Sequence, residues 1–274
     1  MRILITTKDL SQIEEALQIS TQIANHADQE AVELTILAYS RKINGSRAKS
    51  ILPKIQKQLD RFNLKANAEI CYSIPEIIIK VQQNDYDLVI LVESCDFKQK
   101  PILKDPIPLR VEKHASCPVL ILKGTCHPVR KILLCDSGAD TFQSVMNFTI
   151  RLLDLLGGEH DITVLHVMSQ ISAGPGVPGK QLRATAKELI KRQTPEGKLL
   201  ENDLEELDQP NIHPTARVRH GLVVEEIVAE ANTGNYDLVV IGAHQQEGWQ
   251  SFLLENIAEK IIKKIDQSVL VVKL

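Results

Sequence analysis

The sequence is poor in aromatic residues: Phe, Trp and Tyr together make up 4% of its 274 residues. A hydrophobic core must therefore be built mainly from Leu, Ile, Val and Ala, which is typical of buried parallel strands. No apolar run approaches the roughly 20 residues needed to cross a bilayer. The opening segment MRILITTKDL begins a strand at once, without the basic region and cleavage site of a signal peptide. We therefore expect a cytoplasmic protein.

The chain also lacks a strong charge of either sign, a disulfide framework and a metal-binding motif. Its net charge of −3 gives no general attraction for nucleic acid or anionic membrane, and neither is expected as a partner. The five cysteines are odd in number and not closely paired, which argues against disulfide bonds. No CxxC or HExxH spacing occurs, so no metal site is predicted.

What the sequence does contain is an internal repeat. The segment NDYDLVILVES, which begins at Asn84, is matched 150 positions later by GNYDLVVIGAH, and PVLIL at 118–122 is matched by SVLVV at 268–272. Nearer the start, MRILITTKD is matched by RKILLCDSG, and ELTILAYS is matched by DITVLHVM at 161–168. Two tandem domains are therefore predicted, at residues 1–126 and 128–274.

Each copy alternates aliphatic strands with helical segments, which indicates βαβ units and a parallel sheet. The predicted fold is α/β, with two tandem doubly wound, Rossmann-like sheets of five strands in the order 3-2-1-4-5. The second copy has about 22 extra residues between its second and third strands, within an insertion at 172–209. In that insertion Thr194 and Pro195 resemble an N-cap followed by proline at the first helical position.

In an open parallel sheet, ligands bind beyond the carboxyl ends of the strands, where the strand order reverses. In the second copy the first strand ends near Asp136 and the fourth near Gly242. A carboxylate there can hold a ribose hydroxyl or an adenine edge, and a glycine permits close approach of the backbone. The alternative is structural: Asp136 caps the following helix and Gly242 makes a turn.

The second copy resembles a domain of the universal stress protein family, from ILLCDSGADTFQ through DITVLHVM and VRHGLVVEEIVAEA to YDLVVIGAH and SVLVV. The first copy shares the resemblance more weakly. In ATP-binding members, an Asp ends the first strand and a backbone group at the end of the second contacts adenine. A motif of glycine, two residues, glycine, nine residues, glycine and Ser or Thr then wraps the phosphates.

Carried over by this resemblance, the nucleotide-binding positions are Asp136, Val167, Gly242 and, at the Ser/Thr position, Asn256. The other two glycine positions are Gln245 and Glu255, and a carboxylate at the latter opposes a phosphate. The equivalent positions of the first copy, none of which suits the motif, are Thr7, Val92, Cys95, Asp105 and Pro106.

The resemblance implies a non-catalytic stress-response or signalling protein, with a degenerate nucleotide pocket in the second domain and none in the first. One alternative is an enzyme, either an ATP hydrolase or a nucleotide-dependent transferase; no Walker motif, GxSxG or HxE metal site is present, so no catalytic residue is assigned. The other alternative is a structural interaction module without a small ligand. No cofactor is firmly predicted; AMP, adenosine and ATP are the candidates for the second domain.

Protein partners are expected first within the chain itself. The resemblance implies an intramolecular pseudo-dimer of the two domains, with the strands at 118–122 and 268–272 at its interface. Mutual pairing would also remove two aliphatic strand edges that invite aggregation. Homodimers of the whole chain and unidentified protein partners complete the expected set.

Overall fold

The computed structural model describes residues 1–7, 13–27, 32–40, 51–93, 107–124, 128–136, 142–168, 184–243 and 251–273, of which 251–256 are described as backbone only. Contacts between residues divide the chain into two compact units. The first comprises Met1–His127 together with Leu155–Gly157 and Ser268–Lys273, and the second comprises Pro128–Asp154, Gly158–Gln267 and Leu274.

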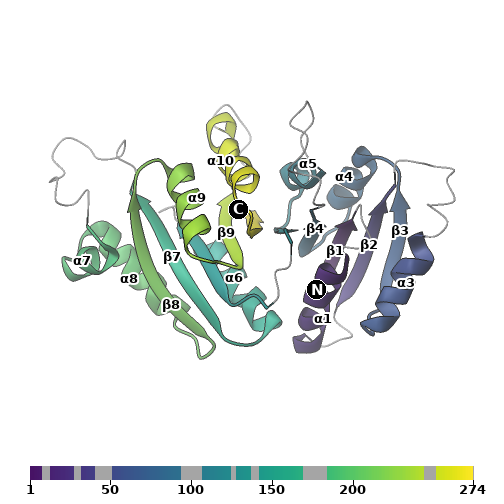
Figure 1. Ribbon diagram of the computed structural model, residues 1–274, viewed down its shortest axis with the longest axis horizontal. Coiled ribbons are helices and arrows are strands. Elements are labelled where there is room, and N and C mark those ends of the chain that lie inside the picture. Colours follow the sequence, from purple (N-terminus) through teal and green to yellow (C-terminus); the bar gives the residue numbers. More distant parts are fainter. Residues whose placement is uncertain are drawn as a thin grey trace. The chain divides into compact units, whose positions relative to one another are not determined.

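The first unit is a parallel sheet flanked by helices. Along the chain it contains β1 (Arg2–Thr7), α1 (Ile13–His26), β2 (Glu33–Tyr39), α3 (Ile51–Arg61), β3 (Ala66–Cys71), α4 (Ile74–Gln83), β4 (Leu88–Val92), α5 (Ile107–His114) and β5 (Val119–Leu122). The strands lie in the order β3-β2-β1-β4-β5, and these neighbours are parallel. This is the predicted order 3-2-1-4-5. Right-handed crossovers place α1 and α3 on one face and α4 and α5 on the other (Figure 1).

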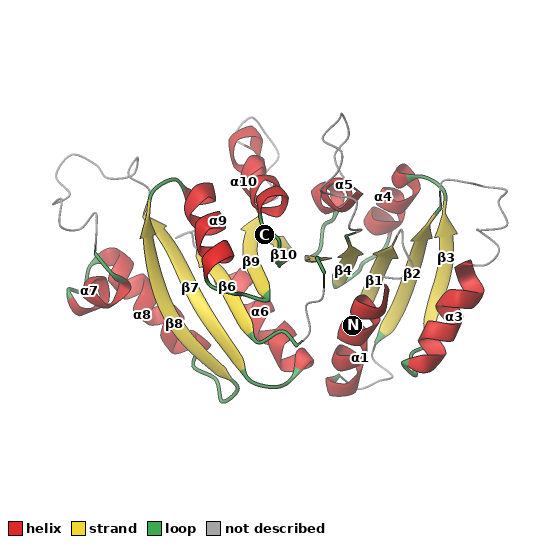
Figure 2. Ribbon diagram, in the orientation of Figure 1, coloured by secondary structure: helices red, strands yellow, loops and turns green. Residues whose placement is uncertain are grey.

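The second unit repeats this plan. It contains β6 (Lys131–Asp136), α6 (Phe142–Leu156), β7 (His160–Met168), α7 (Ala186–Lys191), α8 (Pro195–Leu207), β8 (Ile212–His220), α9 (Val223–Thr233), β9 (Leu238–Ala243) and α10 (Ser251–Lys264). Its parallel strands lie in the order β8-β7-β6-β9, which corresponds to positions 3-2-1-4. Figure 2 shows α9 and α10 on one side of these strands and α6 and α8 on the other.

β10 (Ser268–Lys273) is grouped with the first unit, although the repeat in the sequence places it in the second copy. It pairs antiparallel with β5, and Leu270 lies opposite Leu120. An edge strand presents a row of N–H and C=O groups without partners, and β10 supplies these partners for β5. The Lys273 ammonium also lies 2.5 Å from the carboxylate of Glu112 on α5, with both side chains less than 10% exposed.

Helices form where an apolar stripe and suitable end residues coincide. α1 buries the face predicted from its spacing, which includes Ala16, Leu17 and Ser20. α6 ends before Gly157, whose φ of +68° is the left-handed conformation that follows many helix ends. In the insertion, Thr194 caps α8 by accepting a hydrogen bond from the Gly197 N–H, with proline at the first helical position. The predicted cap is confirmed.

The repeat extends to the hydrogen bonds that hold the start of the sheet. In the first unit, Oδ2 of Asp87 accepts from the backbone N–H of Arg2 at 2.7 Å. In the second, Oδ2 of Asp237 accepts from the N–H of Lys131 at 2.8 Å. Each carboxylate precedes the fourth strand of its unit and fixes the beginning of the first, so the two strands are held in register where they start.

Candidate functional site

The first and fourth strands of the second unit reach the same level of the sheet. Leu134 of β6 pairs with Val240 of β9 in a parallel ladder. Two residues further along each strand are Asp136 and Gly242. Since parallel neighbours advance together, these two residues stand beside one another at the carboxyl edge of the sheet. The backbone at Gly242 is exposed, whereas the residues before it in β9 are buried.

The second strand brings Val167 to the same edge. Asp136 pairs with His166 of β7, and Val167 follows directly. Successive side chains of a strand point to opposite faces, so Asp136 and His166 share one face and Val167 points to the other. The fold therefore gathers Asp136, Val167 and Gly242 at the strand ends where ligands of open parallel sheets bind.

The carboxylate of Asp136 is hydrogen-bonded to His166, a contact that the sequence did not reveal. Nδ1 of His166 lies 2.7 Å from Oδ2 of Asp136, and the two side chains are 14% and 3% exposed. Burial lowers the pKa of the imidazole, but the hydrogen bond to Asp136 and its charge outweigh burial, so the pKa of His166 is raised overall. The protonated imidazolium is thus favoured beside this carboxylate.

Two acidic side chains of α8 act on the same pair. Burial, followed by the negative charges of Asp136 and Glu206, raises the pKa of Asp203 to about 7, although the charge of His166 lowers it. Oδ2 of Asp203 and Oε2 of Glu196 are buried and have no hydrogen-bond partner among the residues that the structure describes. For Asp203, burial without a hydrogen bond at this oxygen thus favours the neutral form of the carboxyl group.

The corresponding place in the first unit carries neither partner of the pair. Thr7 of β1 pairs with Ala38 of β2 in the register in which Asp136 pairs with His166. Thr7 is 4% exposed, and neither side chain holds a charge. Val92 ends the fourth strand where the second unit has Gly242. The predictions for Cys95, Asp105 and Pro106 fall outside the described residues.

The residues assigned to the phosphates are described only in part. Gln245 lies outside the described residues. Glu255 and Asn256 belong to α10, of which this part is described as backbone only. Asn256 as a binding residue therefore stays a prediction.

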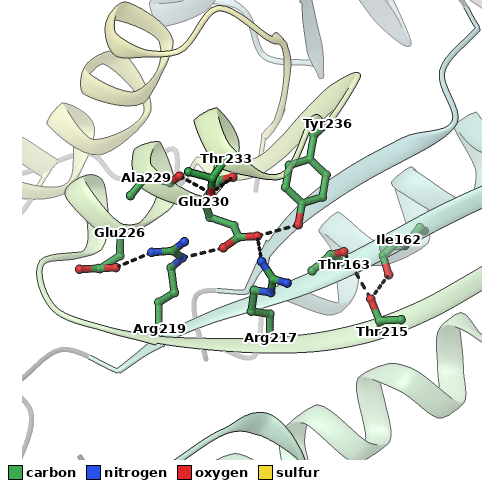
Figure 3. Close-up of polar contacts among 10 residues, drawn as sticks. All are labelled: Ile162, Thr163, Thr215, Arg217, Arg219, Glu226, Ala229, Glu230, Thr233 and Tyr236. Atoms are coloured by element: carbon green, nitrogen blue, oxygen red, sulfur yellow. Dashed lines mark hydrogen bonds and ion pairs between the residues drawn. The ribbon is translucent and has the colours of Figure 1, made fainter. Parts of the chain in front are cut away.

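A second polar cluster surrounds Glu230 of α9 (Figure 3), and one of its members, Arg219, pairs with Val167 in the ladder between β7 and β8. The Glu230 side chain is 0% exposed and accepts hydrogen bonds from Arg219 and Arg217 of β8, at 2.6 and 2.5 Å. The hydroxyl of Tyr236 donates to the same carboxylate at 2.8 Å. Burial raises the pKa of Glu230, but these hydrogen bonds and positive charges outweigh it, so the pKa is lowered overall.

The sequence analysis missed the Glu230 cluster, although its signals are visible. Arg217 and Arg219 are two residues apart on a strand, so they share a face, and Glu226 and Glu230 are four apart on the next helix, so they share a side. Because every acceptor oxygen of Glu230 is engaged, we assign this cluster to holding α9 on β8.

Metal and thiol chemistry receive no support from the described residues. In the described ranges no group of three or more His, Cys, Asp or Glu side chains could hold a metal ion. Burial raises the pKa of the Cys71 and Cys117 thiols to about 11, so both are protonated at neutral pH. No helix in the same ranges is long and apolar enough to cross a membrane.

Comparison with known proteins identifies the family of this chain. The model of the universal stress protein family matches residues 128–273. Universal stress protein MJ0577 of Methanocaldococcus jannaschii is 30% identical over 124 residues, which cover 41% of this chain and 76% of that protein. The chain therefore belongs to the universal stress protein family.

Two solved structures share the fold over nearly the whole chain. A universal stress protein of Archaeoglobus fulgidus DSM 4304 superposes with a TM-score of 0.68 at 16% identity, covering 99% of this chain and 98% of its own. A protein of Pseudomonas aeruginosa UCBPP-PA14 that is described as a universal stress protein gives 0.69 at 20% identity, with 99% and 92% covered. At these identities the likeness concerns the fold alone.

Proposed function

We propose that this universal stress protein is non-catalytic and recognises the nucleoside part of an adenine compound in its second unit. The observation that carries the proposal is the meeting of Asp136, Val167 and Gly242 at one edge of the sheet. A carboxylate, a strand-end backbone and an exposed glycine are suited to ribose and adenine. The compounds expected to bind are adenosine and AMP, at least as well as ATP.

The proposal assigns no nucleotide to the first unit. Thr7 and Ala38 replace the charged pair of the second unit, and Val92 replaces the glycine. A valine side chain at that point fills the space that a glycine leaves for a ligand. We expect this copy to serve as the structural partner of the other in an intramolecular pseudo-dimer, and the whole protein to act in the cytoplasm.

An ATP hydrolase or transferase on the same fold is the competing function. It requires groups that stabilise charge on the transferred phosphate, such as glycine-rich backbone, hydroxyl or cationic donors. The sequence offers Gln245 and Glu255 where the family motif has glycines. The pocket is therefore proposed to be degenerate at its phosphate end.

Ligand-dependent thermal unfolding of the intact protein tests the proposal. Adenosine, AMP, ADP and ATP are each added in excess, because a ligand specific to the folded state raises Tm. We expect adenosine and AMP to raise Tm and Asp136→Asn to abolish the rise. Asp161→Asn, which removes an exposed carboxylate at the opposite end of β7, is the matched control and should bind as the wild type does. No shift with any of the four compounds would overturn the proposal in favour of a module without a small ligand.

A further inference from the structure

The helix α8 lies on the side of the sheet opposite α9 and α10 and belongs to the insertion between β7 and β8 (Figure 2). α8 packs against both of these strands and buries Leu200 and Leu207 completely. Its N-terminus is capped by Thr194, so the helix is well formed in itself. This apolar contact holds α8 on the sheet. The charged groups beneath the helix strengthen or weaken that attachment according to their protonation.

Those charged groups form one cluster, which we call the α8 seat: Asp136 of β6, His166 of β7, and Glu196, Asp203 and Glu206 of α8. A side-chain hydrogen bond joins His166 to Asp136 across these two neighbouring strands. Glu206 is also bonded through Oε2 to Gln143 of α6. The charges of Asp136, Glu196 and Asp203 act on His166, and that of Glu206 acts on Asp203, so the charge of the α8 seat changes when protons leave it.

We propose that the α8 seat is a proton-controlled latch, which holds α8 on the sheet when His166 and Asp203 are protonated and loosens it when both lose their protons. In the protonated state the imidazolium lies among carboxylates and Asp203 is neutral. Loss of both protons removes the positive charge of the imidazolium and adds the negative charge of the Asp203 carboxylate, so the α8 seat becomes more negative. Repulsion between like charges in this partly buried cluster then favours departure of α8, which carries three of the four carboxyl groups.

Both titrations act in the same direction. The pKa of His166 is raised in the folded protein, so its contribution to stability is fully present below its ordinary pKa and is lost as pH rises through the folded value. The pKa of Asp203 is raised to about 7, so the folded state prefers the neutral acid and this preference is lost as pH rises through that value. The latch therefore loosens as pH rises through neutrality.

The first unit lacks the latch and supplies an internal control. Its strands carry Thr7 and Ala38 where the second unit has Asp136 and His166. Its helix α3 precedes β3 as α8 precedes β8. Opening of α3 is therefore expected to be independent of pH over the range in which α8 responds.

Hydrogen exchange of the intact protein at about pH 6 and pH 8, corrected for the intrinsic exchange rate, tests the latch. We expect protection of α8 to fall about tenfold, the effect of roughly one pKa unit of linkage, with α3 unchanged. In Asp203→Asn the change should shrink to less than about threefold. Glu205→Gln, an exposed neighbour on the same helix, should behave as the wild type. An α8 whose protection is independent of pH, or a full response in Asp203→Asn, would overturn the proposal.

A measurement on the unmodified protein tests the latch even where a variant fails to fold. The imidazole of His166 is followed by NMR during a pH titration, with its signal assigned through His166→Gln. We expect its titration to lie above that of a free histidine and to be accompanied by loss of α8 protection. A titration at or below the ordinary value would show that no such latch exists.

Discussion

Lys80 and Glu230 stand at the same position of the two repeats, 150 residues apart, and carry opposite charges. Lys80 donates to Glu69 of β3, and Glu230 accepts from Arg219 of β8. The strand-to-helix ion pair is kept in both units with its charges exchanged. Its setting differs, because the Glu230 side chain is fully buried whereas that of Lys80 is 31% exposed.

Removing the charge at this position should therefore have unequal effects in the two units. Glu230→Gln leaves Arg217 and Arg219 without their carboxylate at a buried point and should cost about 3 kcal/mol of unfolding free energy. Lys80→Met breaks a partly exposed pair and should cost about 0.5 kcal/mol. Urea unfolding of each variant measures both values. Equal losses would contradict the role assigned to burial.

Acid should weaken the Glu230 cluster. The pKa of Glu230 is lowered in the folded protein, so its stabilising contribution is present above the ordinary pKa of a glutamate and is lost as pH falls through the folded value. The difference in unfolding free energy between the wild type and Glu230→Gln should narrow as pH falls from about 6 to about 3. Urea titrations across this range measure it, and a constant difference would argue against ionisation of Glu230 in the fold.

The ion pair between Lys273 and Glu112 should be needed to keep β10 against the first unit. Lys273→Met leaves the carboxylate of Glu112, a residue only 4% exposed, without its cation and should cost about 3–5 kcal/mol. The double variant Lys273→Met/Glu112→Gln removes both charges and should recover most of this loss. Urea unfolding of the single and double variants tests the pair, and a double variant no more stable than the single would refute it.

Substitution at Glu255 should change the preference between nucleotides. One unit charge opposed by another near 4 Å, at an effective dielectric constant of about 20, costs about 4 kcal/mol. Glu255→Gly should therefore strengthen binding of ATP far more than binding of AMP. Calorimetric titration of both proteins with both ligands measures the change. Tight binding of ATP by the wild type, unchanged by the substitution, would contradict the assigned position of Glu255.

The two parallel sheets could be predicted because their buried strands are runs of aliphatic residues, and the internal repeat aligns the runs of one copy with those of the other. The hydrogen bond between His166 and Asp136 could not be predicted, because it depends on the register between two strands whose paired residues are 30 positions apart in the sequence. Sequence spacing also gave no sign that Asp203 lies over that pair, because α8 belongs to an insertion with no counterpart to align. Asp136 and Gly242 could be found from the ends of the strands, but the choice between a binding and a structural role, and the position of Val167, came from the resemblance.

The antiparallel pairing of β10 with β5 has a consequence during synthesis of the protein. Lys123 donates its backbone N–H to Ser268, 145 residues further along the chain, at the start of β10. At about 5–20 residues per second, a ribosome needs on the order of ten seconds to synthesise that interval. During this time the aliphatic edge of β5 lacks its final neighbour, so the nascent chain exposes this edge to chaperones, or to neighbouring nascent chains, until β10 has been made.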